Sequence, residues 1–458
     1  MSATESSGLS ALSPLDGRYR RAAEPLRALL SEAGLIRERI RIEARWLLHL
    51  AQAAPSLSGA KLTPAVRAAA QALAADPPED AAEAVKRIEA RTNHDVKAVE
   101  YYVREVLQAA GATAANLELV HFGCTSEDIN NLSYAKLLAA AREVLLGVAE
   151  QLTQALTALA REHADLAMLA RTHGQPASPT TLGKEFANVV VRLQRAQQRF
   201  ASVAILGKFN GAVGNYNAHV AAAPELAWPQ ITQRFIESLE LRENPFTTQI
   251  EPHDWIGEYC DAVAALNVID IDLCRDIWGY VSLGYLRQKP VAGEVGSSTM
   301  PHKINPIDFE NAEGNLGVAN ALLRHFAEKL PVSRWQRDLT DSTVLRNVGV
   351  ALGHTLVAWR STLRGLGKID VDPARIAADV VGAWEVLGEA VQTVLRAHGV
   401  ADGYERLKEF TRGRAIDAES LHAFIDSLPL PATDKARLKQ LRPQDYVGLA
   451  GELARKVP

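Results

Sequence analysis

The sequence predicts an all-α protein, an elongated bundle of long helices flanked by smaller helical N- and C-terminal domains. Proline indicates where long helices fit, because a proline inside a helix removes a hydrogen bond and clashes with the preceding turn. Long proline-free stretches cover residues 79–175, 253–289, 307–330, 332–372 and 374–428. Alternating strand patterns are scarce, and neither GxGxxG after a strand nor the phosphate-binding GxxxxGKS/T occurs. A nucleotide-binding α/β fold is therefore disfavoured.

The first long helix is predicted from Asn131 to Leu169, where apolar residues recur at three- and four-residue spacing. At about 1.5 Å per residue it would extend roughly 50 Å, far beyond a usual globular helix. Gly147 is the residue that interrupts the pattern. Similar segments, which would complete the bundle, run over 181–205, 253–286, 307–330 and 343–366.

The 458 residues are enough for several domains. We place an N-terminal domain at 1–113, the bundle at 114–366 and a C-terminal helical domain at 367–458. No apolar run approaches the roughly 18 residues that a membrane span needs. The first ten residues lack the basic and apolar segments of a signal peptide. We therefore expect a cytoplasmic protein without a membrane partner.

The composition also disfavours several kinds of ligand. With 50 Lys and Arg against 54 Asp and Glu, and no basic run, we expect no nucleic-acid partner. The three cysteines, Cys124, Cys260 and Cys274, match neither a disulfide framework nor a zinc site. Nothing around Cys124 resembles a base, so we expect a buried thiol rather than a nucleophile. An anionic ligand would need local positive charge.

The most informative polar segment is 293–306, Gly-Glu-Val-Gly-Ser-Ser-Thr-Met-Pro-His-Lys-Ile-Asn-Pro, between two predicted long helices. Its glycines give the freedom that a mobile lid needs. Asn305 suits an N-cap and Pro306 a first helical residue, so the segment would end at a helix N-terminus, where anions bind readily. Lys303 adds a positive charge there. A capped turn alone would explain Asn305 and Pro306, but not the whole segment.

Residues 296–306 resemble the GSSxMPxKxNP signature of the fumarase/aspartase superfamily. The resemblance implies a bundle of long helices, a homotetramer and elimination of fumarate or a related reaction. It assigns Ser297 as the base, with Lys303 and Asn305 stabilising negative charge on the substrate carboxylate. Serine is a poor base, so backbone amides, a helix N-terminus and Lys303 would have to stabilise its alkoxide. Ile304 stands where many relatives have arginine, so a cationic contact is missing there.

A second polar segment is 171–181, Arg-Thr-His-Gly-Gln-Pro-Ala-Ser-Pro-Thr-Thr, in which Ser178 and Pro179 suit a helix cap and first helical residue. A lone histidine is more often structural, but His173 between Thr172 and Gly174 would be free to reach a ligand. The segment resembles the second sequence region of the superfamily. That resemblance implies that His173 is the general acid.

A third segment, 121–131, would begin the first long helix with Thr125 or Ser126 as N-cap. Capping alone would account for these hydroxyl groups. The segment nevertheless resembles the TSxDxxN region, which binds the part of the substrate that becomes fumarate. We assign His121, together with His94, to substrate binding or proton support, and Glu310 to orienting a histidine.

Further segments resemble the adenylosuccinate lyase family within this superfamily, in its bacterial form, and the resemblance covers nearly the whole chain. Residues 16–19 and 91–95 resemble its nucleotide-binding parts, 247–254 its substrate-amide contact, and 337–342 with Arg346 its phosphate site. Two guanidinium groups and a hydroxyl can hold a dianion with charge-assisted hydrogen bonds. A solvated, charged helix start would also explain that last segment.

The family resemblance implies cleavage of a C–N bond, giving fumarate and AMP from adenylosuccinate, and fumarate and AICAR from the succinyl-aminoimidazole-carboxamide ribotide. It implies a small-molecule substrate, no metal or cofactor, and a homotetramer with active sites shared between subunits. His173, Ser297 and Lys303 are the expected catalytic residues. The expected substrate-binding residues are Arg18, Tyr19, Asn93, His94, Asp95, His121, Thr125, Ser126, Thr172, Gln249, Ser298, Asn305, Glu310, Arg337, Ser342 and Arg346.

Two alternatives stay open. Carboxymuconate cycloisomerase shares the signature GSSTMPHK but acts on a substrate without phosphate, so the expected phosphate site argues against it. A helical scaffold without catalytic activity is the alternative from another class, since elongated bundles also serve as interaction platforms. A scaffold without activity would be expected to lack Ser297, His173 or Lys303. All three residues are present, which argues against this alternative.

Overall fold

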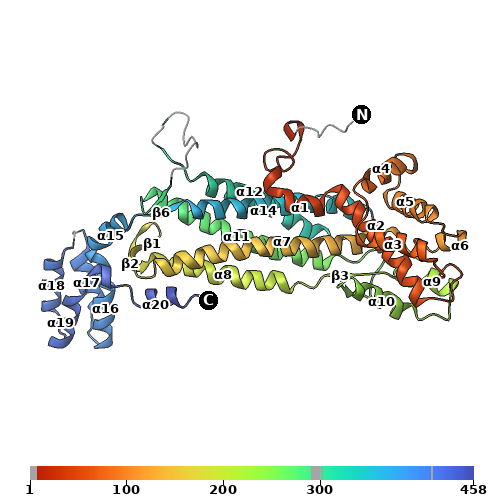
Figure 1. Ribbon diagram of the computed structural model, residues 1–458. Coiled ribbons are helices and arrows are strands. Elements are labelled where there is room, and N and C mark those ends of the chain that lie inside the picture. The colour runs from red at the N-terminus through yellow and green to blue at the C-terminus, as the bar shows by residue number, and fades with distance from the viewer. Residues whose placement is uncertain (1–7, 290–299, 301–302, 414–415) are drawn as a thin grey trace. The chain divides into compact units, whose positions relative to one another are not determined.

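The computed structural model describes residues 8–289, 300, 303–413 and 416–458. Helices dominate these residues, which confirms the predicted all-α class (Figure 1). The chain divides into two compact units. Unit 1 comprises residues 1–148, 197–268 and 314–358, and unit 2 comprises residues 149–196, 269–313 and 359–458. The predicted division into three domains stays a prediction.

Long helices supply residues to both units, and each overlaps one of the predicted segments. Their bounds are α7 Ser126–Glu162, α8 Leu182–Ser202, α11 Asp254–Ser282, α12 Ile307–Lys329 and α14 Val348–Gly367. The short helix α13, Thr340–Leu345, precedes α14 where one continuous helix was predicted. Helix α12 begins one residue after Pro306, the predicted first helical residue.

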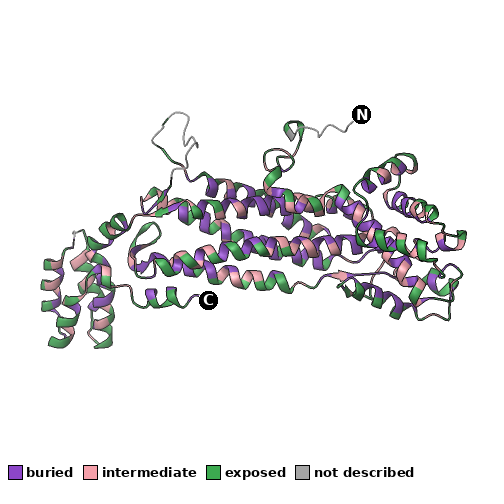
Figure 2. Cartoon of the chain, in the orientation of Figure 1, coloured by how far each residue is buried: buried purple, intermediate pink, exposed green. Residues whose placement is uncertain are grey.

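In unit 1 the long helices are tied by buried polar contacts as well as by apolar packing. Tyr259 of α11 donates to the main-chain oxygen of Leu138 in α7 at 3.1 Å. The amide of Asn267 in α11 lies 3.0 Å from both Asn320 of α12 and Thr355 of α14. Buried polar groups need such partners, so these contacts fix how the helices pack. Figure 2 shows buried residues along these helices.

The rest of unit 1 consists of α2 and of shorter elements, and α2 and α3 pack side by side (Figure 1). Side-chain caps set several helix starts: Ser31 accepts from the Gly34 amide, and Thr63 from the Val66 amide. The elements are η1 Gly8–Ser10, α1 Arg20–Leu30, α2 Glu32–Ala53, α3 Pro64–Ala75, α4 Ala81–Thr92, α5 Asp95–Ala109, α6 Ala114–Leu117, β3 Leu206–Gly207, α9 Asn217–Ala222, α10 Trp228–Ser238 and β4 Arg242–Glu243. Strands β3 and β4 pair in parallel.

The described residues of unit 2 form two antiparallel strand pairs and the C-terminal helices. Strand β1, Ala167–Thr172, pairs with β2, Gln175–Thr181, and β5, Leu286–Gln288, pairs with β6, Ile369–Val371. The helices are α15 Pro373–Val381, η2 Trp384–Leu387, α16 Gly388–Ala397, α17 Gly403–Thr411, α18 Ala418–Ser427, α19 Ala432–Gln440, η3 Pro443–Asp445 and α20 Ala450–Arg455. Leu395, Leu421 and Ile425 belong to their shared core.

The β1–β2 hairpin corrects two predictions. The first long helix was predicted to continue to Leu169, but α7 ends at Glu162 and Leu169 lies in β1. Ser178 and Pro179 were predicted to start a helix, but they lie in β2. Thr181 caps α8 instead, because its hydroxyl accepts from the Lys184 amide at 3.2 Å.

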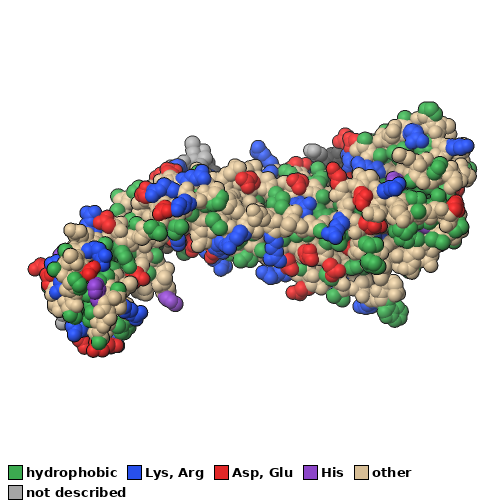
Figure 3. Space-filling view, turned by 90° about the horizontal axis from the view of Figure 1, so that it is seen from below, with side chains coloured by type: hydrophobic (Ala, Val, Ile, Leu, Met, Phe, Trp, Pro, Cys, Tyr) green, Lys and Arg blue, Asp and Glu red, His purple; other side chains and the backbone are tan. Residues whose placement is uncertain are grey.

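Among the described helices, none combines the length and the apolar character that crossing a membrane requires. On the face shown in Figure 3, acidic and basic side chains are interspersed.

Candidate active site

The predicted site residues fall into two groups. In unit 1 lie Arg18, Tyr19, Asn93, His94, Asp95, His121, Thr125, Ser126, Gln249, Arg337, Ser342 and Arg346. In unit 2 lie Thr172, His173, Lys303, Asn305 and Glu310. Ser297 and Ser298 lie outside the described residues.

The start of α7 is held by a buried ion pair. Asp128 and Lys208 have fully buried side chains, and their Oδ1 and Nζ atoms lie 3.1 Å apart. The other carboxylate oxygen of Asp128 accepts from the Thr125 amide at 2.7 Å. Lys208 also donates to the main-chain oxygens of Gly211 at 2.9 Å and Gln249 at 2.7 Å. This pair therefore fixes two predicted substrate-binding segments, around Thr125 and around Gln249.

Arg337 lies between those two segments. Its Nη2 atom is 2.9 Å from Oε1 of Glu127, and its Nη1 atom donates to Oε1 of Gln249 at 3.3 Å. Asp341 lies 3.7 Å from the same guanidinium and accepts from the Ser342 amide. The structure thus brings the predicted phosphate residue Arg337 beside the predicted amide contact Gln249.

Asp95, the first residue of α5, lies between two arginines. Its Oδ2 atom is 3.0 Å from Nη2 of Arg39 and 3.2 Å from Nη2 of Arg346. Burial alone would raise the pKa of this carboxyl, but Arg39, the Val96 amide and Arg346 hold the pKa below its usual range. The preceding residue, His94, caps α5 by accepting from the Lys97 amide at 3.2 Å. Asn93, in the left-handed conformation, ends α4.

His121 is paired with a buried glutamate. Its Nδ1 atom lies 2.6 Å from Oε1 of Glu43, whose side chain is 0% exposed. Burial would lower the pKa of His121, but the Glu43 carboxylate outweighs this effect and the pKa is raised. The Glu43 carboxylate therefore favours the protonated form of His121. Burial together with Glu43 raises the pKa of Cys124 far above its ordinary value, consistent with an unreactive thiol.

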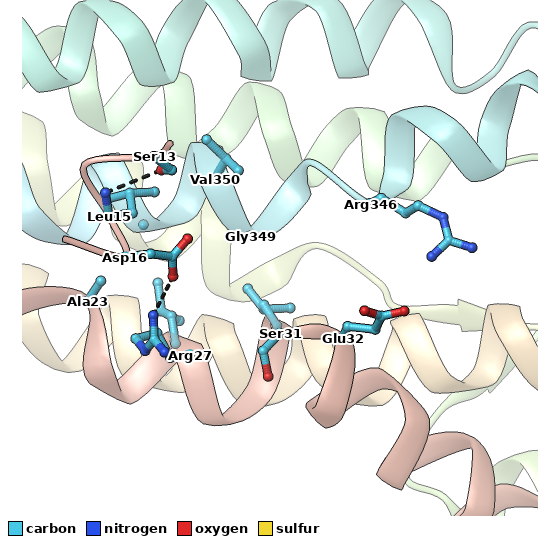
Figure 4. A pocket seen from close by; sticks show the side chains of 13 residues that line it. Ser13, Leu15, Asp16, Ala23, Arg27, Ser31, Glu32, Arg346, Gly349 and Val350 are labelled. Carbon is cyan, nitrogen blue, oxygen red and sulfur yellow. Dashed lines mark hydrogen bonds and ion pairs between the residues drawn. The ribbon is translucent and has the colours of Figure 1, made fainter. Parts of the chain in front are cut away.

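The N-terminal segment forms a pocket with Arg346. The pocket has a volume of about 260 Å³ and is lined by Asp16, Arg27, Glu32, Arg346 and neighbouring residues. Figure 4 shows the Asp16–Arg27 pair toward one end and Glu32 and Arg346 toward the other. Beside Asp16, the side chain of Arg18 is exposed, and Tyr19 packs against an apolar cluster.

His173 lies at the tip of the β1–β2 hairpin in unit 2. Thr172 and Gln175 are paired, so His173 and Gly174 form a two-residue turn with φ of 52° and 75°. Two positive φ values in such a loop are typical of a type I′ turn, which suits the twist of a hairpin. Thr172 and His173 are exposed, so the hairpin presents the predicted acid at the surface of its unit.

Lys303 and Asn305 precede α12 in unit 2, near its N-terminal end. Lys303 is exposed, so its ammonium group is accessible, and a helix N-terminus beside it favours anions. Glu310 accepts a hydrogen bond from the indole of Trp278 at 3.2 Å. In the described part of the chain this carboxylate contacts a tryptophan, so its predicted role in orienting a histidine stays a prediction.

Several residues of this site were missed by sequence reasoning. Arg39 and Glu43 lie on the buried face of α2, four residues apart, where an amphipathic pattern would place apolar residues. Charged residues at these apolar positions of the helical pattern could have indicated functional or paired groups, because buried charges need partners. Lys208 was missed as well, while Glu127, Asp128, His253 and Asp341 lie in segments that the resemblance marked but were not assigned individually. His253 and Asp341 form a buried pair, with 3.5 Å between Nε2 and Oδ2.

The described residues contain no group of three or more His, Cys, Asp or Glu side chains arranged to hold a metal ion. The charged groups instead pair with one another, as in Asp95–Arg346 and Glu127–Arg337. The exposed cation Arg346 is the kind of group that binds phosphate or carboxylate ligands.

Comparison with known proteins gives consistent results. A family model described as lyase matches residues 17–320, and one described as adenylosuccinate lyase C-terminal matches residues 333–447. The chain is 52% identical over 451 residues to an adenylosuccinate lyase of Escherichia coli, covering 97% of this chain and 98% of that protein.

Solved structures support the fold. A fumarate lyase from Mesorhizobium has a TM-score of 0.74 at 19% identity, covering 95% of this chain and 97% of that one. The 3-carboxy-cis,cis-muconate lactonizing enzyme from Pseudomonas putida has a TM-score of 0.72 at 23% identity, covering 94% and 95%. At these identities the likeness concerns the fold alone.

Proposed function

The chain belongs to the adenylosuccinate lyase family, and on this premise we propose that it eliminates fumarate from adenylosuccinate to give AMP. We further propose that it cleaves the succinyl-aminoimidazole-carboxamide ribotide to fumarate and AICAR. Both substrates are small phosphorylated molecules that carry a succinyl group on nitrogen. The observation that carries the proposal is the similarity to a curated adenylosuccinate lyase over almost the entire chain.

Elimination of fumarate requires a base for the carbon-bound proton, an acid for the leaving nitrogen, and stabilisation of the developing negative charge. In the proposed mechanism Ser297 removes the proton and His173 protonates the nitrogen. Lys303 and Asn305 stabilise charge on the substrate carboxylate. The exposure of His173 and Lys303 is compatible with these roles.

Most of the substrate-recognition residues lie in unit 1. Arg337, Ser342 and Arg346 bind the phosphate, Gln249 contacts the substrate amide, and Asp95 belongs to the nucleotide-binding residues. The proximity of Arg337 to Gln249, and of Arg346 to Asp95, supports this assignment. His121, held by Glu43, serves substrate binding or proton support. The remaining assigned contacts are Arg18, Tyr19, Asn93, His94, Thr125, Ser126, Thr172 and Ser298.

The proposed assembly is a cytoplasmic homotetramer whose active sites are shared between subunits. Symmetric packing of four helical bundles can bring helix ends of neighbouring chains together. In the superfamily arrangement, His173 and Ser297 of one site come from different chains.

The experiment that tests the proposed function measures fumarate and the nucleotide product released by the purified chain from each of the two substrates. The same assay with 3-carboxy-cis,cis-muconate tests the alternative reaction. We expect one fumarate per AMP or AICAR formed, and no lactone from the muconate. Turnover of the muconate without fumarate release from either nucleotide would overturn the proposal.

A further inference from the structure

We propose that Arg39 of α2 is a positioning residue of the active site. It holds Asp95 directly and Arg337 indirectly, through Asn130 and Glu127. This inference rests on the proposed function, because Asp95 and Arg337 are taken there as substrate contacts. Arg39 is not among the residues that the family resemblance assigned.

Arg39 is a buried cation with two partners from different parts of the chain. Its side chain is 5% exposed, and its Nη2 atom lies 3.0 Å from Oδ2 of Asp95. Its Nε atom donates to Oδ1 of Asn130 in α7 at 2.8 Å. Because a guanidinium group is planar and rigid, two such bonds fix both partners relative to α2. A lysine could not make both bonds in this geometry.

The contacts continue from Asn130 to Arg337. The amide nitrogen of Asn130 donates to Oε1 of Glu127 at 2.7 Å. Arg337 binds the same oxygen at 2.9 Å, and the Glu127 side chain is 3% exposed. A buried carboxylate held by two donors has little freedom to move. Arg39, Asn130, Glu127 and Arg337 therefore form one connected polar chain within unit 1.

Arg39 also holds Asp95 when Arg346 binds a ligand. The Oδ2 atom that binds Arg39 also binds Arg346, whose side chain is 48% exposed. A phosphate dianion at Arg346 would compete with Asp95 for that guanidinium group. Asp95 would then keep Arg39 as its cationic partner. Arg39 thereby keeps Asp95 charged and in place whether or not Arg346 has turned to a ligand.

The test compares Arg39→Gln with Arg41→Gln as the matched control. Arg41 lies on the same helix, is 23% exposed, and pairs with Glu38 and Asp76 instead of with the active site. Loss of a charge-assisted contact corresponds to roughly tenfold in an equilibrium constant. We expect Arg39→Gln to raise KM for adenylosuccinate roughly tenfold while kcat falls less than about threefold. The control should keep both values within about twofold of the unmodified chain.

A double variant separates positioning from a general loss of stability. If Arg39 acts by placing Arg337, the KM increases of Arg39→Gln and Arg337→Gln should combine to less than their product. Simple multiplication of the two effects, or a KM of Arg39→Gln equal to that of the control, would overturn the inference. Urea unfolding of each variant shows whether the kinetic change follows stability.

If Arg39→Gln does not fold, Asn130→Ala is used in its place. The alanine removes the link between Arg39 and Glu127 without leaving an unpaired charge buried. The same KM increase and the same less-than-multiplicative combination with Arg337→Gln are expected, and an unchanged KM overturns the inference. Absence of fumarate release by the unmodified chain would instead defeat the proposed function. If the unmodified chain releases fumarate normally and Arg39→Gln has the same KM as Arg41→Gln, only the proposed role of Arg39 is wrong.

Discussion

Replacing Lys208 with methionine should cause a large loss of stability. The Lys208 ammonium pairs with Asp128 at 3.1 Å, and neither side chain is exposed. It also donates to the main-chain oxygens of Gly211 and Gln249. Methionine fills a similar volume but provides no charge and no donor. The variant therefore removes the cationic partner of the Asp128 carboxylate and one donor each to the carbonyl groups of Gly211, Thr248 and Gln249.

The size of the effect follows from these contacts. Breaking a buried ion pair by removing one partner costs about 3–5 kcal/mol. The Thr125 and Asn210 amides still donate to Asp128, which moderates the loss. The Gly211 oxygen still accepts from the Gly214 amide at 3.3 Å, so mainly the Gln249 oxygen loses its donor, which costs about 1 kcal/mol or more. We therefore expect Lys208→Met to lower the free energy of unfolding by about 3–5 kcal/mol.

Urea unfolding at a fixed protein concentration measures this loss, because association would otherwise change the apparent stability. Lys136→Met is the control, since Lys136 pairs with the exposed Glu240 and should cost less than about 1 kcal/mol. Adding Asp128→Asn to Lys208→Met should restore part of the stability, because no charge then remains buried. If Lys208→Met is no less stable than Lys136→Met, the buried pair does not stabilise this region and the reasoning fails.

Three other perturbations test separate parts of the account. Ser297→Ala should abolish fumarate release while adenylosuccinate still binds, and near-normal turnover would exclude Ser297 as the base. Arg337→Ala should raise KM more than it lowers kcat, because a phosphate remote from the reacting carbon contributes mainly uniform binding; a loss confined to kcat would contradict this. Asp270→Asn concerns stability against pH. Burial raises the pKa of Asp270 to about 7, above its ordinary 3.8, despite hydrogen bonds from Thr362 and Cys274. The folded state therefore binds the Asp270 proton more tightly than the unfolded state does. This difference stabilises the folded state fully below pH 3.8, and the stabilisation is lost as pH rises through about 7. Asp270→Asn should flatten that part of the unfolding profile, and an unchanged profile would show that Asp270 does not cause it.

The long helices could be predicted because their signal is local. Proline positions and apolar spacing placed α8, α11 and α12 within a few residues of their observed starts and ends. The β1–β2 hairpin could not be predicted in this way. Ser178 and Pro179 carry a local helix-start signal, but pairing with β1 decides their conformation. Strand pairing over such a short segment leaves little trace in the spacing of apolar residues.

The site was only partly predictable for a similar reason. Family resemblance supplied Asp95, Arg337 and Arg346, which the structure places among charged partners. It did not supply Arg39, whose contacts with Asn130 join residues 91 positions apart. Such long-range partners depend on how α2 packs against α7. A buried charge in the sequence indicates that a partner exists, but not which residue it is.

Mixed tetramers test the central claim most directly, which is that His173 and Ser297 of neighbouring chains act as acid and base at one site. His173→Ala and Ser297→Ala tetramers should each be inactive, because every site lacks one of the two groups. After equal amounts are dissociated and reassembled at random, about a quarter of the sites should receive both intact residues. Fumarate release from adenylosuccinate near that fraction of the unmodified rate is the predicted result. Verified mixed tetramers that remain inactive would contradict the claim.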